Sequence, residues 1–275
     1  MGSRLAGRLL QAGHEVLVWN RTREKAAPLV EQGAILAESP AELARRAEAV
    51  ITMVSDATAL WAVVEGPNGI AARAGESLTV IEMSTVGATA VERLRSLLPE
   101  AVGLLDAPVL GSLTEAESGD LKIFVGGPEQ LVARWKPLLS DLGDPRHLGP
   151  LGSGAAAKLV ANSTLFGVLT ALGEALALAH GLGLATNATF DALATTPLAA
   201  QAERRRAAVE SGEYARRFAL SLAVKDSDLI IEAAAEAGID LRVAPAARAW
   251  LAEAEEAGWG SRDYSAILAW ILRAH

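Results

Sequence analysis

Lys158 and Asn162 stand four residues apart in an otherwise apolar stretch and are the first candidates for chemistry. On a helix, the two side chains share one face and lie one above the other. A lysine ammonium can donate a proton to an oxygen or stabilise negative charge on it, and an amide can orient a ligand without adding charge. The alternative is that Lys158 reaches along the helix surface to solvent. The helix alone leaves both interpretations open.

The stretch that carries this pair runs from Gly152 to Gly183. It begins Gly-Ser-Gly, contains no proline and is rich in alanine and leucine, which predicts one helix about 40 Å long. Apolar residues occur on every side of this helix, so we expect it to be buried. Its most apolar window, Leu159 to Ala179, contains Asn162 and Glu174, and we interpret it as a core helix rather than a membrane span.

Short apolar strands alternate with helices in the part of the chain before this helix. We expect strands at residues 14–20, 49–54, 78–83, 103–108 and 121–125. This alternation predicts an α/β fold with a Rossmann-like, doubly wound parallel sheet. The chain after Gly152 reads as helices alone, which predicts an all-α domain. We therefore expect two domains, residues 1–150 and 151–275, joined through the long helix, with the boundary in the glycine- and proline-rich segment 143–154.

The first residues resemble the middle of a dinucleotide-binding motif rather than its beginning. In such domains a first strand leads into a glycine-rich turn, and the first helix points its N-terminus at the pyrophosphate. Met1-Gly2 stands directly before a helix, at the last position of that turn. We therefore expect this sequence to lack the first strand of the sheet and most of the glycine-rich loop.

The strand after that helix ends in Asn20, Arg21 and Thr22, where a ribose-binding residue is expected. An Asp or Glu at this place accepts bonds from a free 2′-hydroxyl, whereas these polar and cationic side chains suit a 2′-phosphate. This predicts that NADP is preferred over NAD as the cofactor. The alternative is that Arg21 is an ordinary exposed arginine at a helix start.

Composition excludes several classes of function. A formal net charge of −8 argues against nucleic acid as a partner, and the absence of cysteine excludes disulfides and thiolate metal sites. The four histidines show no metal-ligand spacing, and they are His14, His147, His180 and His275. Arg4 and Arg8 are not followed by the apolar region of a signal peptide. We expect a cytoplasmic protein that binds no metal and no membrane.

With these residues in view, the chain resembles the β-hydroxyacid dehydrogenase family, which includes 3-hydroxyisobutyrate dehydrogenases, tartronate semialdehyde reductases and glyoxylate/succinic semialdehyde reductases. The resemblance spans the whole chain and rests on several short motifs in the expected order. These are Trp19-Asn20-Arg21-Thr22, Met53-Val54-Ser55, Ser84-Thr85, Asp106 to Ser112, Gly119 to Gly127, Gly152 to Asn162, and Lys225-Asp226 after Phe218.

The resemblance implies a role for each matching position. Met53, Val54 and Ser55 would lie along the cofactor, Thr85 near the nicotinamide, and Met1 at the phosphate turn. Lys225 would reach back to the cofactor. Lys158 would be the general acid/base and Asn162 its partner on the substrate. Of the two interpretations of Lys158, these implied roles favour catalysis over a lysine that reaches to solvent. The side chain of Lys158 would then face the nicotinamide.

The substrate motif departs from the family pattern at two positions. Leu110 stands where the family usually has a serine, and Ser112 stands where it has a second glycine. Leu110 removes a hydroxyl that would bind a substrate carboxylate. We expect the backbone N–H groups of Gly111 and Ser112, and the Ser112 hydroxyl, to bind the acid end of the substrate.

The implied reaction is hydride transfer between nicotinamide C4 and the carbonyl of a small β-hydroxyacid or semialdehyde. One alternative is an imine reductase of related fold, although those relatives usually have Asp or Tyr where Lys158 stands. The other is a cofactor-binding or oligomerisation module that has lost catalysis. The apolar surface of the second half also predicts a homodimer or homotetramer.

Overall fold

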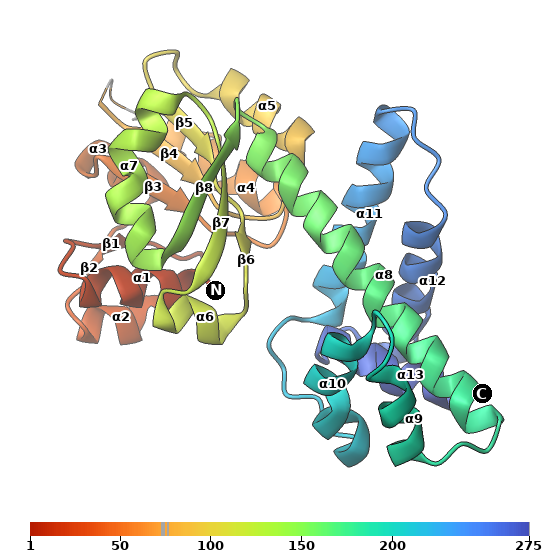
Figure 1. The fold of residues 1–275 in the computed structure, drawn as a ribbon. Helices are drawn as coiled ribbons and strands as arrows, with labels where there is room; N and C mark the ends of the chain where they lie inside the picture. Colours follow the sequence, from red (N-terminus) through yellow and green to blue (C-terminus); the bar gives the residue numbers. More distant parts are fainter. Residues whose placement is uncertain (73–74, 76, 275) are drawn as a thin grey trace. The chain divides into compact units, whose positions relative to one another are not determined.

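The computed structural model describes residues 1–72, 75 and 77–274 of the 275-residue chain. It contains two compact units, Met1–Leu159 and Val160–His275. Figure 1 shows that the first unit holds the strands and that the second is built from helices. The chain passes from one unit to the other inside one long helix. The first compact unit therefore extends a little beyond the boundary expected at residue 150.

A mixed sheet of six strands forms the centre of the first unit. Its strands, in chain order, are β3 (Ala49–Thr52), β4 (Thr79–Glu82), β5 (Gly103–Asp106), β6 (Val109–Leu110), β7 (Leu121–Gly126) and β8 (Gly143–Gly149). β3, β4 and β5 are parallel neighbours, β7 is antiparallel to β5 and β6, and β8 pairs in parallel with β7. The predicted α/β class with a Rossmann-like parallel sheet is confirmed. The sequence pattern did not predict the antiparallel extension through β7.

A separate pair of short parallel strands, β1 (Leu17–Val18) and β2 (Ile35–Leu36), precedes this sheet in the chain. Within the described residues, neither strand is hydrogen-bonded to β3. In the doubly wound strand order, a first strand lies between these two groups. The first described element of the chain is the helix α1 (Gly2–Gln11).

Helices cover both faces of the larger sheet, as Figure 1 shows. The helices and short helical turns of this unit after α1 are η1 (Arg23–Ala26), α2 (Ala27–Glu31), α3 (Pro40–Arg46), α4 (Ala57–Val64), η2 (Ile70–Ala72), α5 (Ala88–Leu97), α6 (Leu113–Ser118) and α7 (Glu129–Leu142). Ile81 and Leu105 are buried in the same cluster as residues of α1 and α7. Their neighbours Val80 and Leu104 are buried with α4 and α5. Adjacent residues of β4 and β5 are thus buried against helices on opposite faces of the sheet, which explains why both strands are continuous apolar runs.

Two helices of this unit begin at polar residues that cap them. The Oγ of Ser39 accepts a hydrogen bond from the backbone N–H of Glu42 at 3.2 Å at the start of α3. An Asp56 carboxylate oxygen accepts from the N–H of Ala59 at 2.8 Å at the start of α4. Each cap satisfies an N–H group that has no partner within its own helix.

Every described element of the second unit is helical, which confirms the predicted all-α half. Its elements are the greater part of α8 (Ser153–Gly181), followed by α9 (Thr186–Leu193), α10 (Ala199–Ser211), α11 (Leu220–Glu236), α12 (Val243–Ala254), η3 (Glu255–Trp259), η4 (Tyr264–Ala266) and α13 (Ile267–Arg273). Glycines in the left-handed region end α10 and follow α11, with φ of +73° at Gly212 and +70° at Gly238. Only glycine adopts this conformation without steric cost, so these residues end their helices.

The long helix α8 spans 29 residues, as the lack of proline predicts. The expectation that it is buried on every side is wrong, because Val160 and Leu178 are 65% and 64% exposed. By length and composition alone, α8 is the one helix of the described residues that could cross a membrane. Half of its most apolar window is buried inside the protein, as in the core helix of a globular domain.

The segment 143–154, expected to be a linker, is partly a strand. Its first seven residues form β8, which pairs along β7. Pro145 and the flanking glycines are more typical of a turn than of a strand in the sequence. Proline is nevertheless tolerated at a sheet position where its missing N–H costs no hydrogen bond between strands. The remainder, Pro150 to Gly152, leads directly into α8.

Candidate active site

Three loops meet the carboxyl ends of the parallel strands β3, β4 and β5. They carry the predicted cofactor residues Met53, Val54 and Ser55, then Thr85, and then the substrate motif. The backbone N–H of Val54 donates to the Oγ of Ser84 at 2.8 Å, so the first two loops are joined. Ligands of doubly wound sheets bind outside the carboxyl ends of the strands, which is where these loops lie.

Glu82 lies buried beneath these loops at the end of β4. One carboxylate oxygen accepts a hydrogen bond from the backbone N–H of Ser84 at 2.6 Å, and the other accepts from the hydroxyl of Thr52 on β3. Burial raises the pKa of Glu82 to about 7, and the nearby Asp106 carboxylate also raises it. Sequence reasoning missed this residue, although an acidic side chain at the end of an apolar strand is a visible signal.

Asp106 is the cross-strand neighbour of Glu82 at the end of β5. Its carboxylate oxygens accept hydrogen bonds from the backbone N–H groups of Gly152 at 2.8 Å and Ala155 at 2.7 Å, at the start of α8. Burial raises the pKa of Asp106, while these backbone N–H groups act to lower it. The carboxylate therefore binds the first turn of α8 directly to the end of the sheet.

Lys158 follows that turn on α8, and its side chain is half-buried. Asn162 lies one turn further along the same helix and is buried in the second unit. Its side-chain Nδ2 donates to Asp226 Oδ2 on α11 at 2.8 Å. The other oxygen of Asp226 is 2.6 Å from Nζ of Lys225, the lysine predicted to reach the cofactor.

Asp226 is a second buried acid that the site prediction omitted. Its carboxylate receives both the Asn162 amide and the Lys225 ammonium. Because the amide nitrogen of Asn162 is bonded to Asp226, the amide oxygen is the atom left to accept a bond from another group. No periodicity in the sequence connects two residues so far apart in the chain.

The substrate motif differs from its predicted behaviour at Ser112. Leu110 ends β6 and is half-buried, and Gly111 has φ of +140°. Ser112 is the N-cap of α6, where its backbone N–H donates to Glu115 Oε2 at 2.7 Å and its hydroxyl donates to the same oxygen. Both predicted Ser112 donors thus reach Glu115 in a capping box. The signal was present in the sequence, as Ser112 and Glu115 have the Ser-x-x-Glu spacing.

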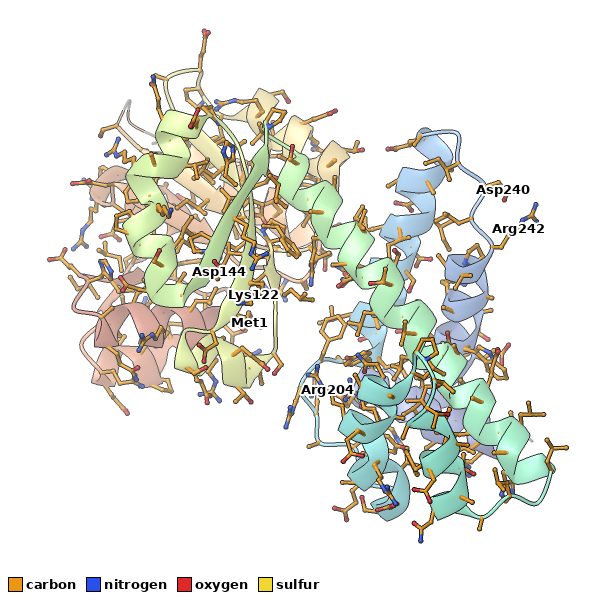
Figure 2. All side chains as sticks on the ribbon, in the orientation of Figure 1. Met1, Lys122, Asp144, Arg204, Asp240 and Arg242 are labelled. Carbon is orange, nitrogen blue, oxygen red and sulfur yellow. The ribbon has the colours of Figure 1, made fainter. Side chains whose placement is uncertain are left out.

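The N-terminus of α1 and the end of β3 lie close together. A Cβ built on Gly2 would be 3.5 Å from the Cβ of Met53, so glycine lets the helix start approach the strand end. Met1 is half-buried at this point and is labelled in Figure 2. The N–H groups of a helix start are a ready site for an anion, and here they are beside a predicted cofactor loop.

The polar residues after β1 are exposed. Asn20 donates through its side-chain nitrogen to the carbonyl of Thr22 at 2.7 Å, which shapes the turn. Arg23 is bound in a bidentate pair to Glu38 at 2.8 and 3.2 Å. Arg21 is exposed and makes no ion pair within the described part of the chain. Arg21 is therefore the arginine of this turn that can bind an anion without breaking an existing pair.

A nicotinamide dinucleotide fits these residues. A helix start beside a strand end suits the pyrophosphate, and exposed Arg21 and Thr22 follow the next strand, where the ribose binds. Among the described residues, no group of three or more His, Asp or Glu could hold a metal ion. His14 pairs with Asp141 at 2.7 Å, and His275 lies outside the described residues. The fold and these loops define a dinucleotide-binding protein.

Two family models together match nearly the whole chain. A model of the NAD binding domain of 6-phosphogluconate dehydrogenase matches residues 1–156. A model described as NAD-binding of NADP-dependent 3-hydroxyisobutyrate dehydrogenase matches residues 152–271.

Individual proteins are similar over the same length. Glyoxylate/succinic semialdehyde reductase 1 of Arabidopsis thaliana is 32% identical over 98% of this chain and 94% of its own. The 3-sulfolactaldehyde reductase of Escherichia coli is 29% identical over 98% of this chain and 91% of its own. The solved structure of 3-hydroxyisobutyrate dehydrogenase from Mycobacterium tuberculosis with L-serine has a TM-score of 0.88 at 25% identity and covers 98% of this chain and 95% of its own.

The chain belongs to the β-hydroxyacid dehydrogenase family and is an NAD(P)-dependent oxidoreductase. The resemblance inferred from the short motifs is thereby confirmed.

Proposed function

We propose that this protein transfers hydride between nicotinamide C4 and the carbonyl carbon of a small acid-bearing aldehyde or the matching hydroxyacid, with Lys158 as the general acid/base. The observation that carries the proposal is the position of Lys158. It lies one turn beyond the point where α8 is bound to Asp106, at the end of the sheet to which the cofactor loops belong. Lysine in that position suits an oxygen that gains negative charge.

When bound, the cofactor supplies the hydride. The ammonium of Lys158 would stabilise the charge that develops on the carbonyl oxygen and deliver the proton there, and the neutral amine would accept it in the oxidation direction. Asn162 would accept a hydrogen bond from a substrate hydroxyl through its amide oxygen, because its nitrogen is bonded to Asp226.

We infer the substrate class from the named relatives and from the chain's own motif. Glyoxylate, succinic semialdehyde and 3-sulfolactaldehyde, the compounds in the relatives' names, are all aldehydes that carry an acid group. Leu110 supplies no hydroxyl for such a group, and the donors of Ser112 are held by Glu115. The acid end of the substrate would then bind in one of two ways. It would displace Glu115 from Ser112, or it would bind the backbone N–H of Gly111, which is an exposed residue.

A panel of carbonyl compounds tests the function. Purified protein is assayed with NADPH against semialdehydes, uncharged aldehydes of the same length and a cyclic imine. We expect the acid-bearing aldehydes to have the highest kcat/KM. Faster reduction of the cyclic imine would favour an imine reductase, and cofactor binding without turnover of any compound would favour a non-catalytic module.

NADP is proposed as the preferred cofactor because Arg21 and Thr22 are exposed where a 2′-phosphate would bind. Arg21→Ala should weaken NADPH binding by about tenfold, the loss of one arginine–phosphate contact, and leave NADH unchanged. The matched control is Arg23→Ala, whose guanidinium is already paired with Glu38. Isothermal titration of both cofactors with the unsubstituted protein and the two variants measures the six affinities. Equal losses for NADPH and NADH in Arg21→Ala would contradict the assignment.

The predicted homodimer or homotetramer and the cytoplasmic location also stay proposals. Exposed apolar side chains on α8 support the first of them, because Val160 and Leu178 lie open on this long helix, and Leu182, directly after its end, is exposed as well.

A further inference from the structure

We propose that Asp106 is a positioning residue for Lys158: by binding the start of α8 to the end of β5, it fixes where the lysine amine is presented. This inference rests on the proposed role of Lys158 and adds a second residue to the same reaction. Asp106 itself is buried and bonded to backbone, so it acts through the helix rather than on the substrate.

The hydrogen bonds define the position of the helix start in two places. One oxygen of Asp106 accepts from Gly152, just before the helix, and the other accepts from Ala155, inside its first turn. A carboxylate that bridges two N–H groups on one turn restrains both the translation and the rotation of that turn. Lys158 is three residues after Ala155, so its Cα is set by the same turn.

Close backbone packing around Asp106 supports the same conclusion. A Cβ on Gly126 of β7 would be 2.3 Å from Asp106 Oδ1, and a Cβ on Gly154 of α8 would be 2.2 Å from the carbonyl oxygen of Phe124. Glycine on both sides lets the helix start lie directly against the strands. A side chain at either glycine would clash with these atoms, so both glycines are needed for this close approach of the helix start to the strands.

The chemical nature of the anchor is also specific. The backbone N–H groups at a helix start carry partial positive charge, and hydrogen bonds from them to a carboxylate are stronger than those to a neutral acceptor. A neutral Asn has the same shape but would place an NH₂ group against one of the two N–H donors. That replacement weakens the anchor without removing the side chain.

A small displacement of the lysine matters because proton delivery needs hydrogen-bond distance. A misplacement of about 1 Å can cost on the order of a hundredfold in turnover. Asp106→Asn should therefore lower kcat by about ten- to a hundredfold and change the NADPH dissociation constant by less than about threefold. A loss of the fold would instead lower the amount of active enzyme, so the measured turnover and NADPH binding would fall together.

The experiment is a double-mutant cycle of Asp106→Asn and Lys158→Ala, measured as kcat on the best substrate of the panel and as NADPH affinity. If Asp106 acts through Lys158, the double variant loses no more turnover than Lys158→Ala alone. If the two losses multiply, Asp106 acts independently and the inference is overturned. If Lys158→Ala alone keeps normal turnover, the proposed function fails instead, so the two failures are distinguishable.

Two further variants keep the outcome decisive. Ser39→Ala removes the cap of α3, a helix without predicted site residues, and should leave kcat unchanged at a similar loss of stability. Asp106→Ser, which keeps one hydroxyl acceptor, enters the cycle if Asp106→Asn does not fold. Failure of both Asp106 variants to fold, with Ser39→Ala folded, would contradict a positioning role and make Asp106 a requirement of the fold alone.

Discussion

At the scale of single residues, buried acids hold candidate site residues within each of the two units. Glu82 holds the loop of Ser84, Asp106 holds the start of α8, and Asp226 holds the amide of Asn162. Each acid is bonded to N–H or hydroxyl groups, which offsets the cost of burying it. Predicted site residues and the loops beside them are thus oriented by buried acids.

Glu82 predicts a dependence of stability on pH. Its pKa is raised from 4.5 to about 7 in the folded protein, so the folded state keeps a proton that the unfolded state has lost between these values. Its contribution is fully present below pH 4.5 and is lost as pH rises through about 7, at no more than about 1.4 kcal/mol per pH unit.

Glu82→Gln should remove that dependence, because a neutral amide does not titrate. Relative to the unsubstituted protein, the free energy of unfolding of Glu82→Gln should rise from pH 5 to pH 8, as measured by urea denaturation (about 2 kcal/mol or more). The exposed Glu92→Gln is the matched control and should show no such trend. A constant difference between Glu82→Gln and the unsubstituted protein would refute the protonated state of Glu82.

At the scale of elements, the apolar strands and the long helix could be predicted from the sequence, and the contacts that orient the site could not. Continuous apolar runs mark β3, β4 and β5 because helices cover both faces of the sheet. β8 was missed because Pro145, glycines and charged residues give it no apolar period. The bond between Asn162 and Asp226 joins residues 64 apart, and such a pairing depends on tertiary packing alone.

The capping box of α6 predicts an effect on substrate affinity. Glu115 holds both donors of Ser112, and its charge would repel the acid end of a substrate there. Glu115→Gln should therefore lower KM for an acid-bearing aldehyde several-fold and leave KM for an uncharged aldehyde of the same length unchanged. Steady-state kinetics on the two compounds measures this. A parallel change for both would mean that Ser112 and Glu115 serve only as a helix cap.

At the scale of the whole molecule, the chain has a nucleotide-binding unit and a helical unit that share one helix. The helical unit leaves apolar side chains open along α8, which the sequence pattern had predicted to be buried all round. The apolar pattern of α8 could not predict this exposure. A helix that is apolar on all sides can be covered on each side either by its own chain or by another copy of the chain, and the pattern is the same in both cases.

Charged pairs such as Lys122–Asp144 and Arg242–Asp240, labelled in Figure 2, are exposed and contribute little to stability.

The open face of α8 predicts self-association. Light scattering after size-exclusion chromatography should give at least a dimer, and Leu178→Glu should shift the protein towards monomer by placing a charge in the apolar contact. Leu148→Glu is the control, since Leu148 is also exposed but belongs to β8 in the first unit. A monomeric protein, or equal effects of the two variants, would contradict an interface on α8.

Lys158 is proposed to supply the proton in a nicotinamide-dependent reduction. The most direct test of this role is the turnover of Lys158→Ala with NADPH and the best substrate of the panel, alongside the NADPH affinity of the same preparation. We expect a folded protein with normal NADPH affinity and a kcat lower by at least about a hundredfold, the usual contribution of a general acid. The exposed Lys122→Ala serves as control and should keep its activity. Turnover of Lys158→Ala within a few-fold of the unsubstituted protein would contradict the role of Lys158 as the general acid.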